Sequence, residues 1–299
     1  MCTMSQASEI SRNVYLGSTA DAGLDPNHHY SQDMRFDIII EASDNAHLPS
    51  AYTLRSVSEY LEQTNEIQML EFPSSGSVFP GDYETDSILG LCRWMYSIAN
   101  EDQHGARNTD AEGDTNMTSS SGGRKIIILC IDGYTESSLL ALAYIIYSQG
   151  LPVHEAWLYL HREKKRNFFA YAGDLNLLRS IQQPLLRASP NGQAMLSLSP
   201  LASEPKWLSK MDGSLPSRIL PYMYLGNLLH ANNPALLHAL GIRRVLSVGE
   251  HVNWTYKEFN DWEKSRVMAV DNVQDNGVDS LANVFRKCLD FIGKYSRYT

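Results

Sequence analysis

Short apolar runs separated by amphipathic stretches make up the first two thirds of the chain. The runs within 32–42 and 67–72, which contain FDIII and IQMLEF, are predicted to form buried strands. Residues 84–99 carry apolar side chains at helical spacing, and Thr85 is expected to cap this helix. The run KIIIL at 125–129 is apolar throughout, which is typical of a strand in the middle of a sheet.

Three helices are predicted after this central strand. The first has the sequence SSLLALAYIIYSQ and ends at Gly150, a residue type that is common just beyond the end of a helix. The other two span about 153–166 and 172–187. Because strands alternate with helices, the pattern predicts an α/β domain that ends near Arg187.

Two stretches have no periodic pattern of apolar residues. Residues 101–123 are polar and rich in glycine and serine, which predicts a disordered insertion inside the domain. Residues 188–213 are rich in serine, proline and alanine, as expected for a linker. The linker separates the domain at 8–187 from a further segment at 214–299.

The segment after the linker repeats the beginning of the chain. Three pairs of segments correspond in order: 14–17 with 223–226, 38–41 with 245–248, and 87–99 with 280–295. The first pair also has the same spacing to a following alanine, Ala22 and Ala231. Such a repeat predicts two tandem copies of one domain, with 214–299 as the N-terminal part of the second. The position equivalent to Cys130 would fall beyond Thr299. We therefore expect 214–299 to lack a catalytic loop and its central strand, and to be poorly packed with an unpaired sheet edge.

Composition narrows the classes of function. The formal net charge of -9 argues against a nucleic-acid or anionic membrane surface. The four cysteines have no paired spacing, which favours a reducing compartment over a disulfide framework or a zinc site, so a cytoplasmic or nuclear location is expected. The N-terminal sequence MCTMSQASEI lacks the features of a signal peptide, and the apolar run at 138–147 is too short to cross a bilayer.

The loop CIDGYTE between the central strand and the next helix has the character of an anion site. Backbone N–H groups and the helix dipole favour negative charge at such a position. A cysteine at its start, here Cys130, could attack phosphorus as a thiolate, and Gly133 would allow a tight turn. An arginine six residues after the cysteine would hold two phosphate oxygens and stabilise the transition state.

These residues resemble the signature H-C-x-x-G-x-x-R-S of protein tyrosine and dual-specificity phosphatases. Leu129 stands where the signature has histidine, Glu136 replaces its arginine, and Asp132 adds a second carboxylate. The resemblance implies a cysteine-dependent phosphatase fold over 8–187, with a central, mostly parallel sheet flanked by helices. It also implies a phosphate loop formed by Cys130, Ile131, Asp132, Gly133, Tyr134, Thr135, Glu136 and Ser137. Without the arginine and with two carboxylates in the loop, we expect this domain to be catalytically inactive.

The whole chain is similar to fungal two-domain dual-specificity phosphatases associated with cell-cycle control. Members of that family hydrolyse phosphotyrosine and phosphoserine/threonine in proteins through a cysteinyl-phosphate, which implies a phosphoprotein partner and neither a metal nor another cofactor. The family uses an aspartate as general acid after the strand that precedes the helix. Asp271 and Asp275 both lie in that region of the second copy, and the sequence does not choose between them.

Other interpretations of the same residues remain open. The first copy could be a non-catalytic scaffold or regulatory binding module. A sulfurtransferase-like module also uses one cysteine in a loop before a helix, but the repeated YLG segment and the helix from Glu155 to Arg166 argue against it. Cys130 could also be a small buried apolar residue at a strand end, and Glu136 could simply stabilise a helix N-terminus. The basic run 164–166 is interpreted as a solvated helix end.

Overall fold

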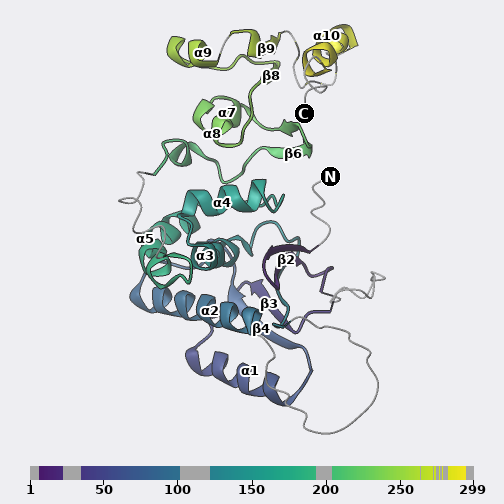
Figure 1. Ribbon diagram of the computed structural model, residues 1–299. Coiled ribbons are helices and arrows are strands. Elements are labelled where there is room, and N and C mark those ends of the chain that lie inside the picture. Colours follow the sequence, from purple (N-terminus) through teal and green to yellow (C-terminus); the bar gives the residue numbers. More distant parts are fainter. Residues whose placement is uncertain are drawn as a thin grey trace, which may run out of the picture. The chain divides into compact units, whose positions relative to one another are not determined.

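The computed structural model describes residues 7–22, 35–101, 122–192, 204–262, 264–271, 273, 276, 278 and 282–293. The chain divides into two compact units, shown in Figure 1. The described residues of the N-terminal unit lie within 7–192, and those of the C-terminal unit lie within 204–293. Among the described residues, none of the helices has the length and apolar character that a membrane span requires.

A five-stranded sheet forms the centre of the N-terminal unit, in the order β1-β2-β5-β3-β4. Only the β1–β2 pair is antiparallel. The middle strand, β5, pairs with β2 and β3, and all five of its residues are buried, as its apolar sequence predicts. The strands are β1 (Ser8–Ser11), β2 (Val14–Ser18), β3 (Ile38–Ser43), β4 (Gln68–Pro73) and β5 (Ile126–Cys130).

Helices flank this sheet, so the predicted α/β class with a central, mostly parallel sheet is confirmed. Helix α3 follows β5 and packs against three neighbouring helices, and its residues Ser138–Ser148 are all buried. Its C-cap is Gly150 at φ 69°, a left-handed conformation that glycine adopts without a steric penalty. The helices are α1 (Ala51–Gln63), α2 (Asp82–Asn100), α3 (Ser138–Gln149), α4 (Val153–Arg162) and α5 (Ala172–Ala188).

Several local predictions were wrong. Helix α1 was not anticipated, and only Leu54 and Leu61 of its residues are buried. Helix α2 begins at Asp82 with Gly81 as its N-cap, and the Thr85 hydroxyl donates to the Gly81 carbonyl instead of capping the helix. The helix predicted over 153–166 ends at Arg162. Most of the predicted disordered insertion, 102–121, lies outside the described residues.

The C-terminal unit contains two small sheets. Strands β6 (Ser217–Leu220) and β7 (Met223–Leu225) are antiparallel, whereas β8 (Val245–Val248) and β9 (Val267–Val270) are parallel. The register of β6–β7 is that of β1–β2, since Ser217 faces Leu225 as Ser8 faces Leu16, and both pairs contain an irregularity at the same place. The short helices are α7 (Leu228–Ala231), α8 (Pro234–Ala239), α9 (Tyr256–Trp262) and α10 (Ala282–Gly293).

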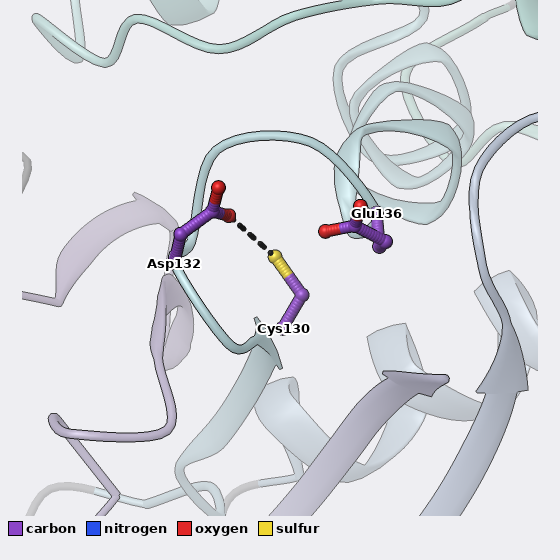
Figure 2. Close-up of side chains that lie close together, drawn as sticks. All are labelled: Cys130, Asp132 and Glu136. Carbon is purple, nitrogen blue, oxygen red and sulfur yellow. Dashed lines mark hydrogen bonds between the residues drawn. The ribbon is translucent and has the colours of Figure 1, made fainter. Parts of the chain in front are cut away.

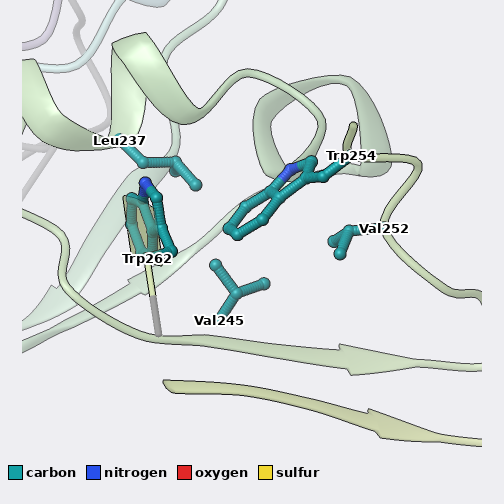
Figure 3. Packing of buried hydrophobic residues seen from close by; sticks show 5 residues of the cluster. All are labelled: Leu237, Val245, Val252, Trp254 and Trp262. Atoms are coloured by element: carbon teal, nitrogen blue, oxygen red, sulfur yellow. The ribbon is translucent and has the colours of Figure 1, made fainter. Parts of the chain in front are cut away.

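A small apolar cluster holds this unit together. Figure 3 shows its members gathered on one side of β8: Leu237, Val245, Val252, Trp254 and Trp262. The end of the predicted linker also belongs to the packed unit, because Trp207 and Leu208 are buried and Asn233 donates to the Trp207 carbonyl at 3.1 Å. The linker prediction was therefore too long at its C-terminal end, where residues 208–210 form a short 3-10 helix.

Candidate phosphate-loop site

The loop Cys130–Ser137 lies at the carboxyl end of β5, directly before α3. Cys130 is 1% exposed and faces Ser18 on β2. Gly133 has φ 66°, and a Cβ atom there would lie 2.8 Å from the carbonyl carbon and oxygen of Gly17. The tight turn that the sequence predicts therefore depends on the absence of a side chain at Gly133.

A carboxylate occupies the inside of this loop. The Asp132 Oδ1 atom accepts hydrogen bonds from the Tyr134 N–H at 2.8 Å and the Thr135 N–H at 3.3 Å. The Cys130 thiol donates to the same oxygen at 3.3 Å, and its sulfur is 3.4 Å from the Ser137 hydroxyl. Figure 2 shows the Asp132 carboxylate turned toward the Cys130 sulfur, on the side opposite Glu136.

Glu136 adds a second carboxylate beside the Cys130 sulfur. Its carboxylate accepts a hydrogen bond from the Thr135 hydroxyl and extends toward the sulfur of Cys130 (Figure 2). Ligand-type atoms of Cys130, Asp132 and Glu136 lie within 4.8 Å of one another, the one such group among the described residues. These are atom types that bind metal ions, although the loop amides and helix dipole around them favour negative charge.

The raised pKa of Tyr171 reflects its burial and the negatively charged groups around the loop. Burial is the largest cause of the raised pKa of its hydroxyl, and the nearby charges of Glu136, Asp174, Asp132 and Cys130 raise this pKa further. Each of those four groups, when ionised, disfavours a negative charge on the Tyr171 oxygen. The same surroundings would disfavour a phosphate dianion.

Arg166 lies beneath the loop, and the sequence analysis did not identify it as part of the site. Its side chain is 2% exposed, and its Nη2 atom donates to the Gly133 carbonyl at 2.7 Å. The interpretation of 164–166 as a solvated helix end was therefore wrong for Arg166. Lys165 adopts φ 55°, a left-handed conformation beyond the end of α4, and no pattern in the sequence indicates this turn.

A second segment packs against the loop from the end of β4. The Ser75 N–H donates to the backbone carbonyl of Glu136 at 2.9 Å, and the Gly76 N–H donates to Asp174 Oδ1 at 2.8 Å. Asp174 on α5 is fully buried, and burial raises the pKa of its carboxyl while the hydrogen bond from Gly76 opposes this rise. The hydrogen bond from Ser75 thus holds the backbone of Glu136 in place.

The candidate general acids belong to the C-terminal unit. Asp271 follows β9, and its Oδ1 atom lies 2.6 Å from His251 Nε2, with side chains 56% and 70% exposed. Asp275 lies outside the described residues. A cavity of about 490 Å³ in this unit is lined by Ser247, His251, Val252, Tyr256, Phe259, Val267 and Ala269. The described residues of the C-terminal unit contain no loop like that of Cys130 beside this cavity.

Sequence comparison relates the chain to a known phosphatase. It is 33% identical over 253 residues to the dual specificity protein phosphatase PPS1 of Saccharomyces cerevisiae. The match covers 73% of this chain and 28% of the yeast protein, so the chain spans less than a third of that relative. No protein-family model matches the chain.

Solved phosphatase structures are similar at low sequence identity. Human DUSP28 is 14% identical, with 60% of this chain and 94% of that chain covered and a TM-score of 0.37. Tk-PTP in its active form is 16% identical, with 59% and 96% covered and a TM-score of 0.37. At these scores the structural likeness adds nothing to the sequence relation. That sequence similarity, together with the α/β sheet and the loop at Cys130, supports a resemblance of this chain to the dual-specificity protein phosphatases.

Proposed function

We propose that the N-terminal unit is a pseudophosphatase, a domain of phosphatase ancestry that binds a protein partner without hydrolysing phosphate esters. The observation that carries this proposal is the carboxylate of Glu136, which stands where the phosphatase signature has its arginine and lies beside the Cys130 sulfur. The loop therefore offers negative charge at the place where the chemistry requires a fixed cation.

The expected effect on catalysis is large. Removing one preorganised donor from an oxyanion site typically lowers the rate by about 100- to 1,000-fold. In addition, each unit charge placed about 5 Å from another of the same sign costs roughly 3 kcal/mol at an effective dielectric constant of about 20, before solvent screening at the open side of the loop. Asp132 and Glu136 would both oppose a phosphate dianion in this way.

An assay of the full chain with a small aryl phosphate tests the proposal. We expect no turnover above that of the Cys130→Ser variant, which lacks the thiol but keeps a hydroxyl of similar size. Turnover by the wild type that disappears in Cys130→Ser would overturn the proposal, because it would show that Cys130 acts as a nucleophile despite Glu136.

A second proposal concerns the C-terminal unit. We infer that 214–299 is the N-terminal part of a second, catalytic copy of the domain, with Asp271 or Asp275 as its general acid. The shared register of β1–β2 and β6–β7, and the relation to a dual specificity phosphatase, support this inference. The phosphoprotein phosphatase activity would then reside in a polypeptide that also contains a second loop with cysteine and arginine.

Transcripts that encode this chain provide the test of the second proposal. We expect a reading frame that continues past Thr299 into a second H-C-x-x-G-x-x-R-S signature. In that longer protein, the Asp271→Asn and Asp275→Asn variants should differ in kcat, with the acid's variant losing about 100-fold or more toward substrates with poor leaving groups. Transcripts without such a signature would refute the catalytic assignment of this unit.

A further inference from the structure

The backbone N–H groups of the loop at Cys130 already have an acceptor. In a loop between a strand and a helix, such groups need a partner, and an anion commonly provides it. Here the Tyr134 and Thr135 N–H groups both donate to Asp132 Oδ1, at 2.8 and 3.3 Å. An oxygen from the chain itself thus takes the place of an oxygen from a bound anion.

The same oxygen lies at the distance from the Cys130 sulfur that a phosphoryl group would need. A reacting centre is held about 3 to 3.5 Å from the attacking atom in a productive complex. Asp132 Oδ1 lies 3.3 Å from the Cys130 sulfur, on the side of the loop amides. Phosphate could approach the sulfur only after the Asp132 side chain had left this position.

We propose that Asp132 is a built-in ligand of the loop, which occupies the anion position and holds the loop closed without phosphate. This inference deepens the proposed pseudophosphatase function and rests on it. Asp132 and Glu136 then block phosphate in different ways: Asp132 fills the position, and Glu136 removes the cation that would hold the ligand. Restoring arginine at position 136 alone would leave Asp132 in place, and the new guanidinium would pair with its carboxylate.

Binding of tungstate, an inorganic phosphate analogue, to the full chain tests this proposal by calorimetry. Three variants are compared: Glu136→Arg, Asp132→Ala/Glu136→Arg and Asp132→Asn/Glu136→Arg. Alanine removes the acceptor, whereas the side-chain oxygen of asparagine can still accept both amides without a charge. Residue 132 is exposed and is not among the described residues with positive φ, so both replacements suit the backbone.

We expect the variant with alanine to bind tungstate at least about tenfold more tightly than Glu136→Arg, a difference of about 1.4 kcal/mol. The variant with asparagine, which loses the charge of Asp132 but keeps its oxygen, should bind tungstate at least about tenfold more weakly than the variant with alanine. Equal affinities of the alanine variant and Glu136→Arg would refute the proposal. Equally tight binding by the asparagine and alanine variants would also refute it, because charge rather than occupation of the amides would then be the cause.

Hydrogen exchange of the full chain keeps the proposal testable if a double variant does not fold. In Asp132→Ala alone, the Tyr134 and Thr135 amides should exchange at least about tenfold faster than in the wild type, while the buried amides of β5 keep their rates. Unchanged exchange at both loop amides would contradict the proposal. Aryl phosphate turnover by the wild type tests the pseudophosphatase function, whereas tungstate binding and hydrogen exchange test the role of Asp132. Failure of one proposal can therefore be distinguished from failure of the other.

Discussion

Replacing Gly133 by alanine tests whether the loop geometry described above determines the stability of the N-terminal unit. Gly133 has φ 66°, where an alanine costs about 1 to 2 kcal/mol. Its new Cβ atom would lie 2.7 Å from Arg166 Nη2 and 2.8 Å from the backbone of Gly17, closer than real Cβ contacts come. Overpacking of this kind costs about 1 to 3 kcal/mol. Together these effects predict a loss of about 2 to 5 kcal/mol in the free energy of unfolding.

A matched control is available in the same unit. Gly90 lies inside α2 without a positive φ, and a Cβ atom added there would have no neighbouring atom within 4 Å. Because glycine lowers helix stability by about 1 kcal/mol relative to alanine, Gly90→Ala should raise the unfolding free energy by about that amount. The two variants make the same chemical change, so only the backbone conformation and the neighbouring atoms distinguish them.

Hydrogen exchange of the β5 amides in increasing urea measures the effect. These amides are bonded to strands on both sides, so their exchange reports opening of the N-terminal unit and excludes signals from the other unit. Gly133→Ala should speed their exchange, and Gly90→Ala should slow it. If the β5 amides of Gly133→Ala exchanged at the wild-type rate, the reasoning would be refuted. It would also be refuted if both substitutions destabilised the unit equally.

Two further predictions concern other parts of the chain. Because burial raises the pKa of Asp174 in the folded protein, its contribution to stability is fully present below the ordinary value of 3.8 and is lost as the pH rises through the raised pKa. The unfolding free energy of the wild type should therefore fall relative to Asp174→Asn over this range in urea titrations, and parallel pH profiles would contradict the expectation. Phe285 and Leu289 on α10 are 57% and 50% exposed, so replacing both with lysine should lower the fluorescence of a bound apolar dye. The unfolding free energy should change by less than about 0.5 kcal/mol, and a larger loss would show that these side chains pack in solution.

The sequence predicts the parts of the fold that apolar side chains determine. The central strand could be recognised because residues 126–129 are all buried, and the end of α3 because Gly150 adopts the left-handed conformation that favours glycine. Helix α1 was not predicted, although Leu54, Val57 and Leu61 have the spacing of an amphipathic helix.

The arrangement inside the loop could not be predicted in the same way. The sequence shows that Asp132 and Glu136 are present, but the hydrogen bonds of Asp132 to two backbone amides depend on the path of the loop. Arg166 is hidden in a basic run that usually faces solvent, and it reaches the Gly133 carbonyl because of the left-handed turn at Lys165. Both features follow from single backbone conformations, for which the residue type gives little indication.

Strand β5, which precedes the loop, is the middle strand of the sheet. The residues that stabilise the fold therefore differ from the loop residues that determine its chemistry. Strand β5 bonds to β2 on one side and to β3 on the other, whereas β6–β7 and β8–β9 form two separate pairs in the described part of the C-terminal unit. The burial of Cys130 at the end of β5 is thus explained by packing alone. Asp132 is exposed and Glu136 only partly buried, so changes at these positions alter the charge of the loop with little effect on the core. A loop of this kind can therefore lose its arginine while the strand, Gly133 and Arg166 continue to hold its shape.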